Sequence, residues 1–264
     1  MREIFKPRLD DYELEGNPFR YKGINYQMQN GILTVTGTTR RFCSTLVIPD
    51  YFISIDYGEE DDYVVLHHVW NIAPAAFVGA PIKHVKLPRD LRRIGESAFA
   101  GCCDLRVVTM GKTDVQIEEN AFAGCVNLQT VTGSVGAIVS ANAFRACTAL
   151  SSFTLHIKDM FANAFHGCKN LTEIWLSDNA SLHQQALCNS DINVMHVRDK
   201  LAFADDVVEH IQRENILLKV LHSASALNHL QGFNVKKVFD VRVIKWFFKS
   251  IPGKAHDYLY NYKA

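Results

Sequence analysis

The segment from Ile94 to Met110 reads IGESAFAGCCDLRVVTM, and its pattern returns three more times along the chain. The later copies begin at Ile117 (IEENAFAGCVNLQTV), Val139 (VSANAFRACTALSSFTL) and Phe161 (FANAFHGCKNLTEIWL). Every copy places Ala-Phe before a cysteine and a leucine, and further apolar residues follow at fixed steps. Because the copies align without gaps and stand in tandem, the chain is predicted to stack similar units instead of folding around one globular core.

Two weaker copies flank these four. They begin at Ile72 (IAPAAFVGAPIKHVKLP) and His183 (HQQALCNSDINVMHV), and each lacks one residue before the position of the leucine. We interpret them as the first and last units of the array. With them included, the anchor residue of the motif recurs at intervals of 22, 23, 22, 21 and 22 residues: Phe77, Phe99, Phe122, Phe144, Phe165 and Leu187. This series predicts about six units over residues 72–198.

The period indicates the fold class. Leucine-rich repeats have periods of about 20 to 29 residues, and each unit contributes a short strand to a continuous parallel sheet. The strand is expected at the Leu-x-x-Val-x-Leu part of each copy, with these residues pointing inward: Leu105, Val108, Met110, Leu128, Val131, Leu150, Phe153, Leu155, Leu171, Ile174 and Leu176. Gly133 stands where another apolar residue is expected. We therefore predict a β-rich α/β repeat, a leucine-rich-repeat solenoid with one parallel sheet.

Four of the seven cysteines recur with the repeat, at intervals of 23, 22 and 21 residues: Cys102, Cys125, Cys147 and Cys168. Neighbouring strands lie about 4.8 Å apart, so equal positions in successive coils stack in rows along the solenoid. These cysteines should form one buried row of reduced thiols, beside a row of phenylalanines. A zinc site would show paired C-x-x-C or C/H spacings, which are missing, so we predict neither a metal nor a cofactor.

The pattern I-x-x-x-A-F-x-G-C-x-x-L-x-x-V-x-L resembles the BspA-type leucine-rich repeat, and the resemblance covers residues 72 to about 198. That family includes many bacterial and protist proteins, and several of them are surface proteins that adhere to host or matrix proteins. The resemblance implies a solenoid that binds other proteins, and it leaves a surface or exported location open.

Charge and hydropathy patterning argue against several other classes. The 28 basic and 28 acidic side chains give a formal net charge of zero, so the whole molecule has no field that attracts nucleic acid. No apolar stretch of 18 residues is present, which argues against a membrane span. The N-terminal sequence MREIFKPRLDDYELEGNPF has no apolar run that would serve as a secretion signal. A soluble protein of the cytoplasm is the expectation.

Residues 1–71 are predicted to form a β-rich N-terminal cap, because a solenoid needs atypical units to cover its terminal cores. Short β-prone runs surround Asn30-Gly31, a strong hairpin signal, and an irregular first coil is expected near Leu46 to Ile55. The acidic run Glu59-Glu60-Asp61-Asp62 could be a calcium loop, but it lacks the alternating carboxylates and terminal glutamate of an EF-hand. We interpret it as a solvated loop.

Residues 199–264 are predicted to form a mostly helical C-terminal cap. Asp205 or Asp206 could cap a helix in AFADDVVEHIQREN, and helical segments are also expected from Ile216 (ILLKVLHSASALNHL) and from Val235 to Pro252-Gly253. A basic amphipathic helix can bind anionic membranes or partners, whereas a helix that covers the last coil with its lysines in water is the simpler interpretation. The basic residues of this last segment are Lys236, Lys237, Arg242, Lys245 and Lys249.

No catalytic constellation is recognisable. His67 and His68 would face opposite sides of a strand, and the H-E-x-x-H, G-x-S-x-G and phosphate-loop motifs are all missing. Cys43, Cys103 and Cys188 could act as nucleophiles only with a distant histidine, and no family signature surrounds them. We predict that the chain is not an enzyme. A solenoid that serves as the recognition arm of an enzymatic C-terminal segment is the weaker alternative.

The leading functional hypothesis is a non-catalytic scaffold that binds a protein partner through the strand face of the solenoid. Side chains alternate across a strand, so the residues on either side of the central apolar position point outward. The partner-binding residues predicted along this row are Trp175, Glu173, His156, His196, Arg198, Lys86 and His84. An exposed tryptophan beside chargeable groups has the composition of a binding hot spot. In the alternative, the C-terminal cap covers Trp175.

Overall fold

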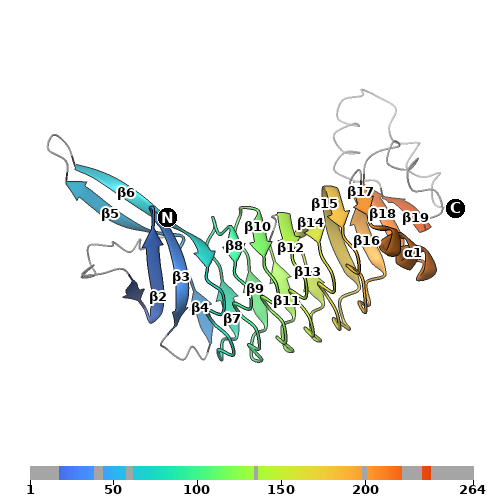
Figure 1. The fold of residues 1–264 in the computed structure, drawn as a ribbon, viewed down its shortest axis with the longest axis horizontal. Coiled ribbons are helices and arrows are strands. Elements are labelled where there is room, and N and C mark those ends of the chain that lie inside the picture. The colour runs from blue at the N-terminus through green and yellow to red at the C-terminus, as the bar shows by residue number, and fades with distance from the viewer. Residues whose placement is uncertain are drawn as a thin grey trace, which may run out of the picture.

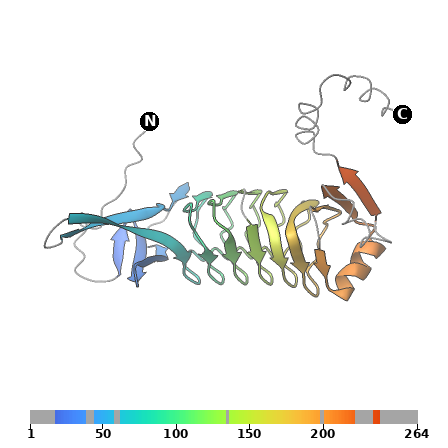
Figure 2. The same cartoon turned by 90° about the horizontal axis from the view of Figure 1, so that it is seen from above.

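The chain folds as a straight stack of coils wound around one continuous core (Figure 1). The computed structural model describes residues 18–38, 44–57, 62–133, 136–197, 201–221 and 234–238. Figure 2 shows the same coils side by side along the long axis, with an antiparallel ribbon at the N-terminal end and the helix at the C-terminal end. The predicted solenoid with parallel strands is confirmed.

Three antiparallel strands begin the described part of the chain: β1 (Phe19–Tyr21), β2 (Ile24–Gln29) and β3 (Ile32–Thr38). Asn30 and Gly31 connect β2 to β3 with φ angles of 51° and 74°, as a two-residue hairpin turn of type I′ requires. The hairpin predicted from this dipeptide is confirmed. Since β3 pairs in parallel with the first strand of the repeats, the hairpin covers the N-terminal end of the solenoid core.

The Leu-x-x-Val-x-Leu parts of the coils form short parallel strands, as predicted. Five of them make a separate sheet: β4 (Thr45–Val47), β7 (His84–Lys86), β9 (Val107–Thr109), β11 (Thr130–Thr132) and β13 (Ser152–Phe153). At Gly133, a Cβ would lie 2.6 Å from Leu155 Cδ2 and 3.0 Å from Met110 Cβ. The side chains of the two adjacent coils already fill this space, which explains the missing apolar residue.

Each repeat coil also contributes a second strand, so the solenoid has two parallel faces where the sequence predicted one. A second row of buried residues lies just before the turn of each coil and closes that side of the core: Ile94, Ile117, Val139, Met160 and Leu182. The strands that carry this row belong to a fourteen-stranded sheet: β6 (Asp62–Ile72), β8 (Arg93–Ile94), β10 (Val115–Ile117), β12 (Gly136–Val139), β14 (His156–Met160) and β15 (Glu173–Leu182). β15 is long enough to occupy both strand positions of its coil.

The Ala-Phe part of each coil forms a tight turn with two left-handed residues. Asn120, Asn142 and Asn163 take the first position with φ near 55°, and Gly101 and Gly124 take the second with φ of 67° and 73°. Asn and Gly adopt this region at low cost, which is why the turn selects them. The turns stack the phenyl rings in a row, with centroids 5.1 Å apart between successive coils from Phe77 through Phe144.

The four repeat cysteines lie in a second buried row. Each thiol donates a hydrogen bond to the carbonyl oxygen of the phenylalanine in the preceding coil, with Sγ–O distances of 3.0 to 3.2 Å for Cys102, Cys125, Cys147 and Cys168. Burial raises the pKa of the Cys147 thiol well above its ordinary value and that of Cys168 to about 12. Cys147 and Cys168 are therefore neutral thiols, and all four cysteines satisfy backbone carbonyls inside the core.

Thiol labelling of the native protein tests this arrangement. We expect a maleimide to modify Cys103, which is exposed, before it reaches Cys125 or Cys147, which are fully buried. Unfolding should make all the thiols react at similar rates, because the protection comes from burial and from the low thiolate fraction. Mass-spectrometric peptide mapping against time reads out each site. Rapid modification of Cys125 in the folded state would contradict the assigned register of the repeat.

The C-terminal part of the described chain departs from the predicted helical cap. Helix α1 (Asp205–Arg213) is present, but Ala204 is its N-cap residue, and Asp206 instead accepts a hydrogen bond from the Gln185 backbone N–H at 2.7 Å. The other described elements are strands that extend the fourteen-stranded sheet: β16 (Val194–Val197), β17 (Leu201–Phe203), β18 (Leu217–Leu221) and β19 (Asn234–Val238).

The expectation of helices from Ile216 and from Val235 is thus wrong for the described residues of those segments. β16 would otherwise leave its backbone groups unpaired at a sheet edge, and β18 satisfies them from Val194↔Leu217 to Val197↔Val220. Arg242, Lys245 and Lys249 lie outside the described residues, and Lys236 and Lys237 are in β19. The parallel sheet runs past residue 198, so the division into cap and repeats stays a prediction.

The first coil leaves the solenoid to form a long ribbon. After β4 the chain enters β5 (Tyr51–Tyr57), which pairs antiparallel with residues 62–68 of β6. β6 returns to the solenoid at Val69, where it pairs with β3 and then with β8. Leu46, Ile48 and Phe52 are buried, as the irregular first coil predicts, whereas Glu59 to Asp61 lie outside the described residues. Among the residues described, no helix is long and apolar enough to cross a membrane.

Candidate protein-binding surface

A cluster of aromatic and charged side chains lies on the outer face of the fourteen-stranded sheet, near its C-terminal end. The Trp175 and His196 rings stack with centroids 3.6 Å apart and planes 15° apart. Glu173 Oε2 lies 2.7 Å from His196 Nε2 and 3.8 Å from Lys219 Nζ. His156 approaches Trp175 edge-on, with a centroid distance of 6.5 Å. We call these five residues the Trp175 cluster.

Strand register brings the cluster together. His156 pairs with Trp175, Trp175 with His196, and His196 with Lys219 on four successive strands. Glu173 lies two residues before Trp175, so both side chains point to the same face of β15. The alternate residues Ile174 and Leu176 point inward and are buried. The core residues of β15 therefore fix the direction in which Trp175 and Glu173 project.

The cluster is partly open to solvent and holds balanced charges. The side chain of Glu173 is 50% exposed and that of Lys219 is 29% exposed, whereas His196 is only 11% exposed. The hydrogen bond with His196, followed by the attraction of Lys219, holds the pKa of Glu173 below its ordinary value. Glu173 is thus ionised at neutral pH and orients the imidazole on which Trp175 stacks. This geometry gives a rigid aromatic platform with an acceptor on one side and a cation beyond it.

The structure groups four of the seven residues predicted from the sequence: Trp175, Glu173, His156 and His196. His84 and Lys86 are exposed on β7, which belongs to the five-stranded sheet, and so they lie apart from the cluster. Arg198 lies outside the described residues. Trp175 remains partly exposed in the structure.

Sequence reasoning missed Lys219, because we expected a helix in its segment. The sequence does not alternate there, because Ile216, Leu217 and Leu218 are all apolar, and such a short apolar run fits a helix and a strand equally well. Only the structure shows the alternation, with Ile216 and Leu218 buried and Leu217 and Lys219 half-buried.

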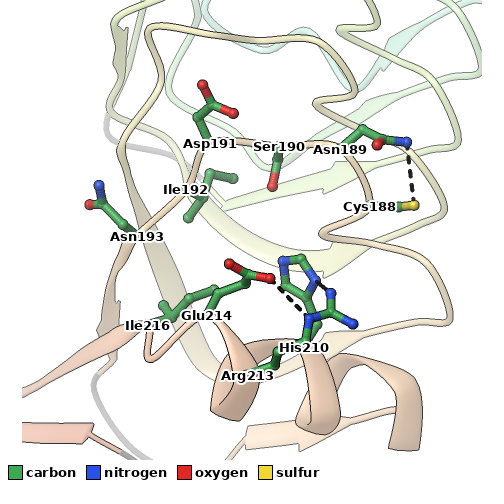
Figure 3. Close-up of a pocket in the computed structure, with 10 residues that line it drawn as sticks. All are labelled: Cys188, Asn189, Ser190, Asp191, Ile192, Asn193, His210, Arg213, Glu214 and Ile216. Carbon is green, nitrogen blue, oxygen red and sulfur yellow. Dashed lines mark hydrogen bonds and ion pairs between the residues drawn. The ribbon is translucent and has the colours of Figure 1, made fainter.

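Two hollows lie elsewhere on the described surface. The first, of about 550 Å³, lies between the turn at residues 188–193 and helix α1 (Figure 3). In it, Arg213 contacts Glu214 Oε1 at 2.9 Å and His210 Nδ1 at 3.1 Å, while Cys188 contacts Asn189 at 3.5 Å. A nucleophilic cysteine needs a base within hydrogen-bond reach. No hydrogen bond links Cys188 to a histidine in the described part of the chain.

The second hollow, of about 790 Å³, is a shallow groove on the fourteen-stranded sheet lined by Glu96, Glu118, Glu119 and Asp159. Arg93 neutralises Glu118 at 2.6 Å. At the other end His183 lies 3.6 Å from Asp159 and stacks on Phe161. Nowhere in the described residues do three His, Cys, Asp or Glu side chains form a group that could hold a metal ion.

Comparison with known proteins agrees with the geometry of the coils. The model of the BspA-type leucine-rich repeat region matches residues 70–193 with six copies. Residues 70–193 belong to the BspA-type leucine-rich repeat family. The six copies agree with the six anchor positions from Phe77 to Leu187, so the predicted repeat is confirmed.

The leucine-rich repeat protein of Treponema pallidum shares the fold of this chain, and two further solved leucine-rich repeat proteins are less similar to it. The leucine-rich repeat protein of Treponema pallidum is 18% identical, with a TM-score of 0.50, and the match covers 89% of this chain and 97% of that one. A leucine-rich repeat protein of Bacteroides capillosus is 22% identical over 54% of this chain and 99% of its own, with a TM-score of 0.40. A leucine-rich repeat protein of Bacteroides ovatus is 17% identical, with a TM-score of 0.42, and the match covers 82% of this chain and 66% of that one. No curated protein matches the chain.

Proposed function

We propose that this BspA-type repeat protein is a non-catalytic scaffold that binds a protein partner through the Trp175 cluster. The observation that carries the proposal is the stacked Trp175–His196 pair, held by Glu173 on a partly exposed sheet face. Hot spots of protein interfaces are enriched in Trp and concentrate the binding energy in a few residues. The pair is already ordered by its strands, so binding costs it little side-chain entropy.

The rest of the strand face supports the same role. On the five-stranded sheet the outward positions carry small or polar side chains such as Thr109, Thr130 and Ser152. The strands β9, β11 and β13 can lie against a partner but offer no aromatic side chain at these outward positions to anchor it. The Trp175 cluster would therefore supply most of the affinity, and the smaller residues would supply shape complementarity.

Replacing Trp175 with alanine should weaken partner capture by at least about 1 to 2 kcal/mol, the threshold for a hot-spot residue. Folding stability should fall by no more than about 1.5 kcal/mol, the upper value of one aromatic stacking pair. Partners are first identified by affinity capture from lysate with the wild-type chain, and their binding is then measured by calorimetry.

Trp70→Ala is the matched control, because Trp70 is also partly exposed on the outer face of this sheet, at its other end. It should leave capture unchanged. Full capture by Trp175→Ala, or equal losses for both variants, would count against the proposed surface.

A further inference from the structure

The second hollow of the fourteen-stranded sheet is a groove that runs along the axis of the solenoid. Its outer row crosses the successive strands β8, β10, β12 and β14 (Figure 1), from Arg93 at one end to Asp159 at the other. Neighbouring strands lie about 4.8 Å apart, so this row is roughly 14 Å long. We call the hollow the Phe161 groove and define it by six of the residues that line it: Arg93, Glu96, Glu119, Ser140, Asp159 and Phe161.

One face of the Phe161 ring is open to this groove. Ser140, Phe161 and His183 hold equal positions in successive coils, since each N–H bonds to the equivalent carbonyl oxygen of the coil before it. His183 stacks on one face of the phenyl ring, with planes 8° apart. The other face therefore points toward the preceding coil, where Ser140 and Ala141 are too small to cover it. These two small residues create the hollow and leave Phe161 36% exposed.

Carboxylates surround the open ring face. Glu118 is already satisfied, because it binds Arg93 at 2.6 Å and accepts a hydrogen bond from the Glu96 N–H at 3.1 Å. In the part of the chain that the structure describes, no Lys or Arg lies within ion-pair distance of the carboxylates of Glu96, Glu119 or Asp159. The groove thus combines an accessible aromatic face with negative charge at both of its ends.

A guanidinium suits this combination. The planar head group of arginine stacks on an aromatic ring and directs its N–H donors outward, where carboxylates can accept them. The chain contains one such contact already, because the guanidinium of Arg92 lies 3.9 Å from the centroid of the Trp70 ring. Two arginines four residues apart lie on the same side of an extended peptide, roughly 13 Å from each other. This spacing matches the three strand intervals between the coils of Glu96 and Phe161.

We propose that the Phe161 groove binds an extended, arginine-containing segment of a partner protein. One guanidinium lies on the open face of Phe161 within reach of Asp159, and a second arginine is held by Glu96 and Glu119. The groove is separate from the Trp175 cluster, because Trp175 lies near the start of β15 and the groove adjoins the end of that strand. The proposal therefore does not depend on the role of that cluster.

A short peptide of the sequence Gly-Arg-Ala-Ser-Ala-Arg-Gly is the probe, and fluorescence anisotropy of its labelled form measures binding to the full chain. Replacing both arginines with lysine should weaken binding by about two- to fivefold, because the ammonium loses the planar stacking contact. Replacing them with citrulline, which keeps the shape of arginine without its charge, should weaken binding by about tenfold or more. High salt should weaken binding of the arginine peptide, since its charges are attracted to exposed carboxylates.

Variants of the groove test each contact. Phe161→Leu should weaken binding of the arginine peptide by about two- to fivefold, because leucine keeps the apolar contact but has no aromatic face. Glu96→Gln combined with Glu119→Gln should weaken it by about two- to tenfold, the range for two exposed ion pairs. Asp104→Asn combined with Glu209→Gln is the matched control, since it changes the net charge equally at two exposed residues outside the groove. The control pair should bind as the wild type does.

Trp175→Ala should also bind the peptide at full strength, which separates this test from that of the Trp175 cluster. Thermal melting should show that every variant folds. A wild-type chain that fails to bind the arginine peptide, or that binds the citrulline peptide equally well, would overturn the proposal. Full binding by Phe161→Leu, or equal losses for the groove pair and the control pair, would overturn it as well.

Discussion

Replacing Phe122 with alanine is expected to lower the free energy of unfolding by about 3 to 5 kcal/mol, the range for removing a core aromatic side chain. Phe122 is fully buried, and its ring lies 5.1 Å from Phe99 on one side and from Phe144 on the other. The substitution removes both stacking contacts and leaves a cavity in the middle of the row. The hydrogen-bonded turns on either side prevent the coils from closing that cavity.

Phe161→Ala is the control for this change, because it deletes the same side chain at a position that is 36% exposed. Phe161 stacks on a single neighbour, His183, at a centroid distance of 4.1 Å. Its loss should cost at most about 1.5 kcal/mol, the upper value for one aromatic pair. Denaturant melts of both variants make the comparison. A loss below about 1 kcal/mol for Phe122→Ala would mean that Phe122 is not a core residue.

The central position of Phe122 in the array also affects the expected shape of the denaturant unfolding curve. Each coil of a solenoid contacts only its neighbours, so stability is a sum of coil and interface contributions. Weakening a central coil therefore loosens the coupling between the two halves of the stack. Besides the lower midpoint, we expect a smaller denaturant m-value for Phe122→Ala, because the halves would no longer unfold in one step.

The rows of the core could be predicted from the sequence because one side chain type recurs at one structural position. Phe99 and Cys102, for example, recur as Phe122 and Cys125 in the next coil, and both rows are fully buried. In a solenoid, equal positions in successive coils must lie side by side, so a repeated pattern translates directly into a row of contacts. The hairpin at Asn30-Gly31 could be predicted for a different reason: a type I′ turn needs a positive φ at both central residues, and few dipeptides other than Asn-Gly adopt it at low cost.

The second strand of each coil was harder to predict. β8 and β10 have only two and three residues, too few for an alternating pattern to be recognised. The prediction for the C-terminal strand β18 was wrong for another reason. A short apolar run fits a helix and a strand equally well, and here the pairing with the edge of β16 stabilises the strand. Such tertiary pairing leaves no local signal in the sequence.

The candidate site was predicted in part because its residues follow the repeat. Trp175 and His196 hold the same position in neighbouring coils, so the sequence alone placed them together. An equal-position alignment would put Thr154 opposite Trp175, but a register shift between β14 and β15 pairs His156 with Trp175 instead. His156 was among the residues predicted for this face, but its direct pairing with Trp175 depends on the backbone register and does not follow from the repeat.

Close backbone approach between coils makes a glycine essential at position 111. A Cβ there would overlap the carbonyl oxygens of Pro88 and Arg89 in the preceding coil, which are backbone atoms that cannot turn aside. The same Arg89 carbonyl accepts hydrogen bonds from the N–H groups of Lys112 and Thr113 at 2.6 and 3.2 Å. An alanine would therefore push the two coils apart where they are hydrogen-bonded.

Gly111→Ala should lower the free energy of unfolding by about 2 to 4 kcal/mol, because the added Cβ overpacks the contact between the coils and weakens their backbone hydrogen bonds. Gly124→Ala is the matched control: Gly124 has a φ of 73°, but the nearest atom to an added Cβ is 3.8 Å away. Ala146 holds the equivalent turn position in the next coil with a φ of 59°, so the turn tolerates alanine there. Gly124→Ala should thus lower the free energy of unfolding by about 1 kcal/mol or less. The strain of an alanine in the left-handed region is partly offset because alanine lowers the conformational entropy of the unfolded chain. Equal losses for the two variants in thermal and denaturant melts would mean that backbone conformation, and not the contact between coils, selects glycine at position 111.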